Sequence, residues 1–335
     1  MSAGQCILSR QMPAYSGGLA VNINVEHFFI VNPVAGKGRA LRLIPVIREY
    51  CEEKKLDYEI VITQYPGHAT EIARAQSALR VMRFYSVGGD GTLNEVLNGM
   101  AGSGSSLACI PGGSGNDFIK SVADPARLKK LIKATIDGAE HLIDYAKVNN
   151  RYFLNIASVG FDAEVVYRRG HFKKLPFISG KMAYVLGILA SIIKCDNRYM
   201  QIDIDGKTIS GKTLLLAVGN GRYYGGGMLA LPEARIEDGL FEICHVGEFK
   251  RLRILSLFPK YMKGLHASIS GVSFYQGKKV RVVTDKPLPM NLDGEIALIP
   301  EASFEILPKG LPFVFPALPA AGPTQIGPQP LPNKS

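Results

Sequence analysis

Three glycine-rich segments in the first third of the chain constrain its fold more than any other feature. They are NPVAGKG (32–38), GGDGTLNE (88–95) and PGGSGND (111–117), and each lies where a run of apolar residues gives way to a helical pattern. Glycine at such a junction allows close backbone approach, so successive N–H groups can surround phosphate oxygens. The N-terminus of the following helix adds a favourable dipole. Together the three segments predict a phosphate-binding α/β sheet.

The order of apolar runs predicts two domains. Strands are expected at 27–33, 58–63, 83–89 and 107–113, alternating with helices, which is typical of an open α/β sheet that binds ligands beyond its strand ends. After about residue 140, short β-rich runs separated by Asp-Gly turns predict an antiparallel sandwich or barrel. We expect the active site in the cleft between the two domains. The expected boundaries are a flexible extension at 1–25, an α/β domain at 26–143 completed by a strand near 304–315, a β-rich domain at 144–303 and a proline-rich tail at 316–335.

Composition excludes several classes of protein. Hydrophobic residues make up 47% of the chain and charged residues 20%, which is ordinary for a globular protein. The five cysteines form no CxxC pair, so neither a disulfide framework nor a zinc site is indicated. No apolar run is long enough to span a membrane and no secretory signal is visible, so a cytoplasmic location is expected. The net charge of +10 suits nucleotide phosphates or an anionic membrane, whereas no nucleic-acid-binding motif is present.

The familiar nucleotide signatures are absent, and carboxylates carry the remaining information. Val31 stands where a Walker A loop needs glycine, and Gly38 follows Lys37, which either reaches a phosphate or is simply an exposed lysine. Asp90 would repel phosphate unless it binds Mg²⁺ or accepts a proton; the alternative is a turn or cap residue. Asp293 and Glu295 form a hairpin turn or, if they face the cleft, divide proton transfer and metal binding between them.

At this point the sequence resembles a known family. The motifs NPVAGKG, GGDGTLNEVLNG (88–99), PGGSGNDF (111–118), GFDAEV (160–165), EDGLFEI (237–243) and LDGE (292–295) occur in the order found in the diacylglycerol kinase catalytic-domain family. The chain is most similar to its bacterial soluble lipid kinase branch, which is related to sphingosine and ceramide kinases. The resemblance implies an ATP- and Mg²⁺-dependent lipid kinase of phospholipid metabolism, with conversion of diacylglycerol to phosphatidic acid as the first choice.

The resemblance also implies roles for individual residues. Catalysis would use Asp90 and the DGE motif, with the general base left open between Asp293 and Glu295. A structural Mg²⁺ would be held by the Asp238 side chain and the carbonyls of Arg235 and Leu240, with Asp144 in a water-linked network toward the active site. The residues expected at the nucleotide come from the glycine-rich segments and the second strand end: Asn32, Pro33, Gly36, Lys37, Thr63, Gly88, Gly89, Asp90, Gly91, Thr92, Asn94, Glu95, Gly113, Ser114 and Asn116. The interpretation from the residues alone is that Asp117 caps a helix that begins at Phe118, as Asn116 can.

The acceptor and the partners are less constrained. Basic residues and an apolar helical pattern at 172–194 fit a segment that rests on an anionic membrane, or an amphipathic helix packed on the β-rich domain. We therefore expect a lipid substrate, peripheral membrane contact and no nucleic acid, with a homodimer left open. The alternatives are a kinase of a soluble substrate such as NAD, and a non-catalytic binding protein. Against the first, we expect a second domain unlike that of NAD kinases.

Overall fold

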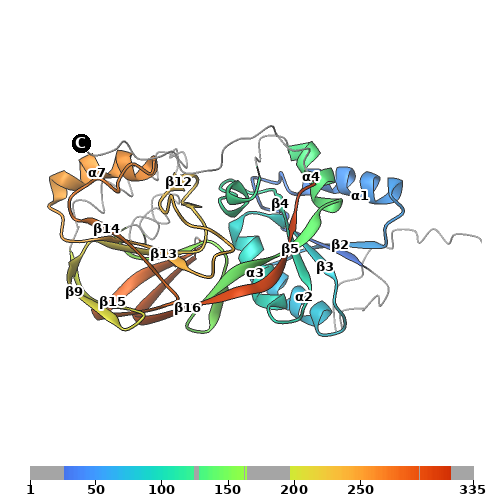
Figure 1. Ribbon diagram of the computed structural model, residues 1–335. Helices are drawn as coiled ribbons and strands as arrows, with labels where there is room; N and C mark the ends of the chain where they lie inside the picture. Colours follow the sequence, from blue (N-terminus) through green and yellow to red (C-terminus); the bar gives the residue numbers. More distant parts are fainter. Residues whose placement is uncertain (1–25, 124–127, 162, 164–196, 294, 318–335) are drawn as a thin grey trace, which may run out of the picture.

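The computed structural model describes residues 26–123, 128–161, 163, 197–293 and 295–317, and shows two parts side by side along one long sheet (Figure 1). The first part has a parallel arrangement of strands. These are, in sheet order, β2 (Tyr58–Ile62), β1 (His27–Val31), β3 (Arg83–Gly88) and β4 (Ser106–Pro111). This confirms the predicted α/β architecture of the N-terminal region.

Helices cover both faces of the parallel strands, which explains why the strands are apolar throughout. Phe28 and Ile30 of β1 pack with α2 (His68–Ser77) and α3 (Asp90–Met100) on one face. Phe29 and Val31, which point the other way, pack with α1 (Ile44–Glu53) and α4 (Leu128–Ile136). A short 3₁₀ segment, η1 (Leu41–Leu43), leads into α1.

The second part is antiparallel and β-rich, as predicted. Its main path is β14 (Val272–Gly277), β13 (Phe241–Val246), β10 (Leu215–Gly219), β7 (Ile156–Gly160) and β15 (Lys279–Leu292). The hairpin of β8 (Arg198–Ile204) and β9 (Lys207–Thr213) adds to β15. Among the described strands, β11 (Tyr223–Tyr224) pairs only with β12 (Met228–Leu229). Within the described residues the sheet continues into the first part rather than returning to β14, so the barrel alternative is wrong.

One strand connects the two parts. β16 (Glu295–Phe315) pairs antiparallel with β15 and with β5 (Ala139–Val148), and its Phe313 lies in parallel register with Leu107 of β4. β5 also pairs with the short β6 (Arg151–Phe153). The sheet is therefore continuous through both parts, and no flexible linker separates β4 from the β-rich strands along this path.

The remaining expectations concern two strands and two helices of the β-rich part. The run 153–161, expected as one strand, is interrupted at Asn155, whose Nδ2 donates to Tyr223 O outside the strand pairing. The run 212–220 is interrupted at Leu214, whose backbone N donates to Val246 O. The expected helix near 249–263 is α7 (Arg251–Met262). The segment 172–194 lies outside the described residues. No helix in the described part of the chain is long and apolar enough to cross a membrane.

A buried histidine beside α7 makes stability depend on pH. His266 has no exposed surface, lies against the rings of Tyr261 and Phe274, and donates from Nε2 to Ala230 O at 3.0 Å. Its Nδ1 has no hydrogen-bond partner among the described residues, so a proton there would be buried without an acceptor. Burial accordingly lowers the pKa of His266 to about 4.

We predict that His266 destabilises the fold as the pH falls from about 6.5 to about 4. In that window His266 is protonated in the unfolded chain but neutral in the folded protein. Lowering the pH therefore favours the unfolded state and reduces the free energy of unfolding by about 3 kcal/mol. Urea unfolding between pH 4 and 8 should show a flatter pH dependence for His266→Gln, whose amide can still donate to Ala230. Exposed His141→Gln serves as control, and equal pH slopes for wild type and His266→Gln would contradict the prediction.

Candidate active site

The three glycine-rich segments meet at one edge of the sheet. They follow β1, β3 and β4, which are adjacent and parallel, so their carboxyl ends coincide. Gly112 N and Gly113 N donate to Gly88 O at 2.7 and 2.9 Å, and Arg39 donates from Nε to Gly112 O and from Nη2 to Gly113 O. Arg39 is a residue that the sequence analysis missed, because an isolated arginine after a glycine turn carries no pattern.

A cavity of about 610 Å³ opens at this edge. Asp293 and Glu295 at the β15–β16 turn line it on the side of the β-rich part, so the cavity lies between the two parts of the protein. The lining contains most residues expected at the nucleotide, including Val34 and Ala35 of the stretch 32–36, together with Gln64, Tyr65, Pro66, Ala69 and Gly115, which were not expected. The other expected residues are Asn32, Pro33, Gly36, Thr63, Gly89, Asp90, Gly91, Thr92, Glu95, Gly113, Ser114, Asp293 and Glu295.

Four expected residues do not line the cavity. Lys37 stands in the first turn in a left-handed conformation, and Gly88 faces the Thr92 side chain, which a Cβ on Gly88 would meet at 2.4 Å. Asn116 shapes the third turn by accepting from Gly113 N and donating to Gly113 O, both at 2.9 Å. Asn94 points instead toward Asp293. A direct contact with nucleotide remains a prediction for each of these four residues.

Asp90 is the first residue of α3 and acts as a cap for a different helix. Its Oδ1 accepts from Asp117 N at 2.7 Å and from Phe118 N at 3.2 Å, at the start of the 3₁₀ helix η2 (Phe118–Ser121). The interpretation that Asp117 caps this helix is wrong. The Asp117 carboxylate is occupied elsewhere, because it accepts from Lys120 Nζ at 2.5 Å and from Gly226 N at 2.7 Å.

Burial raises the pKa of Asp90 from its ordinary value, and the negative charge of Asp117 raises it further. The two backbone N–H groups act in the opposite direction by stabilising the carboxylate. Asp90 therefore accepts two backbone hydrogen bonds in a buried place where its own negative charge is disfavoured by burial and by Asp117.

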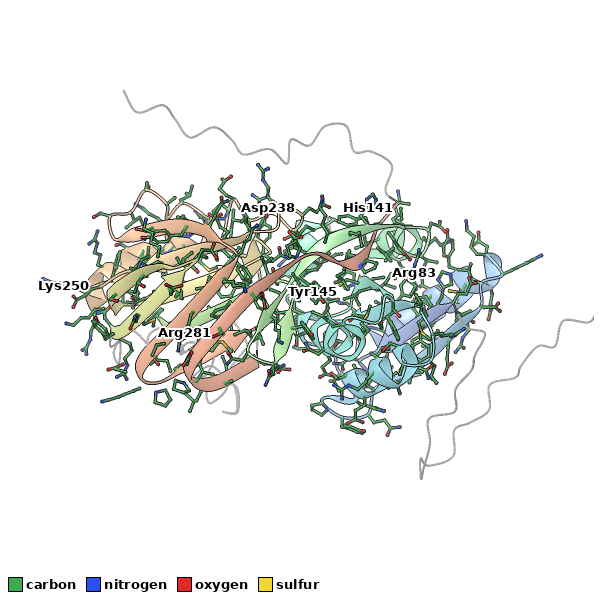
Figure 2. All side chains as sticks on the ribbon, turned by 60° about the horizontal axis from the view of Figure 1, so that its bottom comes forward. Arg83, His141, Tyr145, Asp238, Lys250 and Arg281 are labelled. Carbon is green, nitrogen blue, oxygen red and sulfur yellow. The ribbon has the colours of Figure 1, made fainter. Side chains whose placement is uncertain are left out.

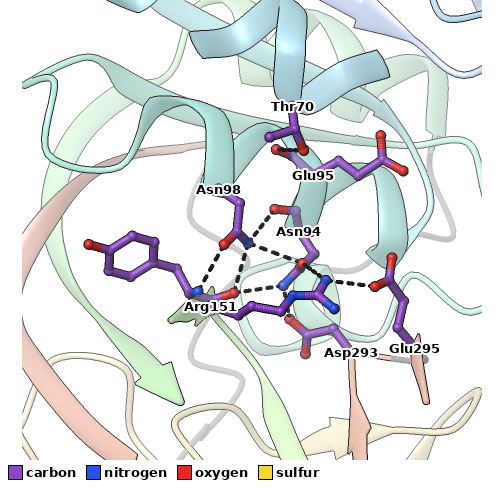
Figure 3. Close-up of polar contacts among 8 residues, drawn as sticks. Thr70, Asn94, Glu95, Asn98, Arg151, Asp293 and Glu295 are labelled. Carbon is purple, nitrogen blue, oxygen red and sulfur yellow. Dashed lines mark hydrogen bonds and ion pairs between the residues drawn. The ribbon is translucent and has the colours of Figure 1, made fainter. Parts of the chain in front are cut away.

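Asp293 and Glu295 flank the tight turn between β15 and β16, and both line the same cavity as Asp90. Asp293 Oδ2 accepts from Asn94 Nδ2 at 3.0 Å, and burial together with the nearby charge of Asp90 raises the pKa of Asp293 to about 7. Glu295 is exposed and pairs with Arg151 Nη2 at 2.6 Å (Figure 3). The two carboxylates therefore both flank the turn and face the cavity, and their roles in proton transfer and metal binding remain predictions.

Two asparagines of α3 hold the carboxylate side of the cavity in place (Figure 3). Asn98 Nδ2 donates to Asn94 Oδ1 at 3.1 Å and Asn98 Oδ1 accepts from Tyr152 N at 2.9 Å, while Asn94 Nδ2 also reaches Tyr152 O at 3.0 Å. Asn98 and Arg151 were missed by the sequence analysis. The spacing of Asn94 and Asn98, four residues apart on one helix face, was the available signal for Asn98. Arg151 had none.

The residues expected at a second magnesium site lie on the loop before β13. Arg235 and Asp238 line a separate cavity of about 430 Å³, and Asp238 Oδ1 accepts from Leu240 N at 3.1 Å. Asp144 is fully buried on β5, and its two carboxylate oxygens accept from Gly239 N at 2.6 Å and Lys309 N at 2.7 Å. Asp144 therefore ties this loop to β16. No cluster of three or more metal-binding side chains occurs among the described residues.

Comparisons with known proteins agree with this architecture. Residues 26–148 match the family model described as the diacylglycerol kinase catalytic domain, and residues 155–315 match the YegS C-terminal NAD kinase beta sandwich-like domain. The second description overturns our expectation that the β-rich part is unlike NAD kinases.

Two curated relatives are named diacylglycerol kinase. The one from Staphylococcus carnosus (strain TM300) is 29% identical over 268 residues, covering 79% of this chain and 87% of the relative. The one from Bacillus subtilis (strain 168) is 27% identical over 269 residues, covering 79% and 88%. A solved structure from Bacillus anthracis str. Sterne superimposes with a TM-score of 0.71 at 25% identity, covering 90% of this chain and 98% of that chain.

The close approach of the second and third glycine turns generates a stability prediction. A Cβ on Gly113 would lie 2.4 Å from Gly89 Cα, which is backbone and cannot rotate away, whereas a Cβ on Gly91 would meet nothing within 4 Å. We expect Gly113→Ala to lower the unfolding free energy of the ligand-free protein by about 1–3 kcal/mol. Gly91→Ala, the matched control within α3, should preserve or raise it. Urea unfolding measures both, and equal stabilities would refute the packing argument.

Proposed function

Because this chain belongs to the diacylglycerol kinase catalytic-domain family, we propose that it transfers the γ-phosphate of ATP to a lipid hydroxyl, with diacylglycerol as the preferred acceptor and phosphatidic acid as the product. One observation supports this most: three glycine turns from the first part and two carboxylates from the second face a single cavity. The turns supply backbone amides that can bind phosphate. The carboxylates supply candidate ligands for Mg²⁺ and a candidate proton acceptor, which a transfer reaction needs besides binding.

The charge of the cavity supports a role for Mg²⁺. Four carboxylates line it (Asp90, Glu95, Asp293 and Glu295), and the described lining contains no lysine or arginine. A triphosphate would enter this cavity against strong repulsion unless a cation accompanied it. Mg²⁺ is commonly bound through one or two carboxylates plus phosphate oxygens rather than by an all-protein cage. Asp90 and Asp293, which already repel each other, would hold it, and bound Mg²⁺ would offset the charge of the phosphates.

We assign the proton acceptor to Glu295. Its carboxylate is exposed at the cavity, where an entering hydroxyl can reach it. Arg151 holds this carboxylate in position, with 2.6 Å between Arg151 Nη2 and Glu295 Oε2. Asp293 is less accessible because Asn94 and Ile156 N approach its two oxygens. In the proposed reaction Glu295 takes the proton of the lipid hydroxyl, the oxygen attacks the γ-phosphorus, and the bond to the β–γ bridging oxygen breaks to release ADP.

The acceptor side of the proposal places the protein at a membrane surface. Diacylglycerol resides in a bilayer, so the chain would work as a peripheral protein that collects its substrate there. The second candidate acceptor is NAD, favoured by the NAD kinase-like description of residues 155–315. Purified protein with γ-labelled ATP, Mg²⁺ and either mixed diacylglycerol micelles or NAD tests both. Labelled phosphatidic acid supports the proposal, whereas labelled NADP alone, or nucleotide binding without transfer, overturns it.

We predict that Asp90→Asn reduces transfer at least about 100-fold while the protein stays folded. The amide oxygen of asparagine can still accept from Asp117 N and Phe118 N, so the cap of η2 is retained and the charge is removed. Circular dichroism verifies the fold, and initial rates with labelled ATP measure transfer. Full activity of Asp90→Asn would refute the assigned role.

A second pair of variants separates the two carboxylates of the turn. Glu295→Gln should lower kcat by about 10²–10⁴-fold, as expected for loss of a general base. Asp293→Asn should instead raise the Mg²⁺ concentration needed for half-maximal rate, because it removes one proposed metal ligand. If Asp293→Asn loses kcat at saturating Mg²⁺ and Glu295→Gln does not, the two roles are reversed.

We retain the loop 235–240 as a proposed second Mg²⁺ site, because the Asp238 carboxylate and the carbonyls of Arg235 and Leu240 are oxygen donors of the kind that Mg²⁺ prefers. MgCl₂ without nucleotide should then raise the melting temperature of the wild type, since a ligand of the folded state stabilises it. Asp238→Ala should lose this increment, whereas Asp90→Asn should keep it. An increment that persists in Asp238→Ala would exclude the site.

A further inference from the structure

Helix α7 has one face committed to the protein core. Ile254, Leu257 and Tyr261 are buried in a cluster with Cys244 and Val246 of β13 and neighbouring strands. Their spacing of three and four residues places them on one side of the helix. This accounts for the inner half of α7 and leaves the composition of the outer half to be explained.

The outer face carries large apolar side chains in contact with solvent. Leu255 is 48% exposed, Met262 is 38% exposed, and Leu265, just beyond the helix, is 61% exposed. Leu255 and Met262 are seven positions apart and so lie on the same stripe of the helix. Single exposed apolar residues are common, but three on one twelve-residue helix and its following turn form a distinct surface.

The same surface is positively charged. Between residues 249 and 271 the chain has five basic residues and no acidic one; the basic residues are Lys250, Arg251, Arg253, Lys260 and Lys263, and all are exposed. No ion pair to these five occurs among the described residues, and only Arg253 of the five makes a side-chain hydrogen bond or ring contact there. Its Nη2 donates to Ser270 O at 2.8 Å, and its guanidinium lies over the Phe249 ring. By contrast, two exposed basic residues of β15 are paired, Lys279 with Glu305 and Arg281 with Glu301. The charge on α7 is therefore left available to an external anion.

We infer that the outer face of α7 and the turn to Leu265, called here the α7 surface, docks on an anionic lipid bilayer. Exposed leucine and methionine fit the boundary between headgroups and acyl chains, and unpaired lysine and arginine fit anionic headgroups. The same basic residues could bind the phosphates of nucleic acid, but nucleic acid offers no apolar layer for Leu255, Met262 and Leu265. Lys250 lies at the outer end of the β-rich part, away from the first domain (Figure 2).

The α7 surface is also connected to the active site through the β11–β12 hairpin. α7 contacts β12, and a Cβ on Gly264 would lie 2.7 Å from the side chain of Leu229. At the other end of the hairpin, Gly226 N donates to Asp117 Oδ2, and Asp117 N donates to Asp90. This inference deepens the proposed function, since a lipid acceptor must reach the active site from a bilayer.

The test measures vesicle binding and transfer separately. Binding of the full chain is measured by flotation with vesicles of phosphatidylcholine alone and with vesicles in which a third of the lipid is phosphatidylglycerol, at low and high NaCl. Lys260→Ala/Lys263→Ala removes two charges from the α7 surface, and Leu255→Ser/Leu265→Ser removes two apolar contacts. Lys207→Ala/Lys286→Ala removes the same charge from exposed positions of β9 and β15 that have no ion pair among the described residues, and is the matched control.

Wild type should bind the anionic vesicles, and more weakly at high salt. The lysine variant should bind roughly 30-fold more weakly, the leucine variant at least about tenfold more weakly, and the control within about threefold of wild type. Equal binding to neutral vesicles, or equal losses for the lysine variant and its control, would overturn the assignment. Salt-sensitive binding of a DNA duplex with no binding of vesicles would do so as well.

A transfer assay distinguishes failure of this inference from failure of the proposed function. With a short-chain, water-dispersed diacylglycerol, the α7 variants should match wild type, because none of their residues lines the active-site cavity. With diacylglycerol in anionic vesicles they should be slower in proportion to their binding. Transfer to the dispersed acceptor with unchanged vesicle rates would reject the α7 surface and leave the kinase proposal standing.

Discussion

Pairing of β16 with strands from both parts of the protein is the constraint on which the active site depends. The strand begins at Glu295 beside the cavity, runs antiparallel to β15 and β5, and ends in parallel register with β4. Backbone hydrogen bonds in one continuous sheet thereby fix the β15–β16 turn relative to the glycine turns. Asp293 and Asp90 come close enough for each charge to disfavour the other, although they are separated by about two hundred residues.

The electrostatics of the cavity follow from this arrangement. Glycine turns offer partial positive charge from backbone amides, and the opposite wall presents carboxylates without a lysine or arginine in the described lining. Such a wall favours binding of phosphate together with a cation over binding of phosphate alone. This preference is the physical basis for assigning phosphate transfer rather than simple nucleotide binding. Asn94 and Asn98 of α3 and Arg151 of β6 support these carboxylates from a helix and a strand.

Patterns in the sequence were sufficient where the relevant physics is local. Alternation of apolar strands and helices predicted the α/β part, because both faces of a parallel sheet must be covered. Glycine at strand ends predicted three turns at one edge of the sheet, since backbone geometry there is set by the residue itself. Local reasoning failed for Asp117, which was expected to cap its own helix; Asp90, remote in sequence, supplies that cap, and the Asp117 carboxylate is held by Lys120 and Gly226. The barrel alternative failed because sheet closure depends on which strands end at an edge.

The sequence by itself determined the glycine turns, the carboxylates and the kind of chemistry they support, because these depend on residue type and short spacing. Only the tertiary structure decided which carboxylates share a cavity, that Arg151 holds Glu295 and that Asn94 holds Asp293, because such contacts join residues from distant strands. It also decided that the basic residues of α7 face solvent beside exposed leucines, while Lys279 and Arg281 of β15 are paired. Charge can be counted in a sequence, but whether it is neutralised depends on neighbours that only folding brings together.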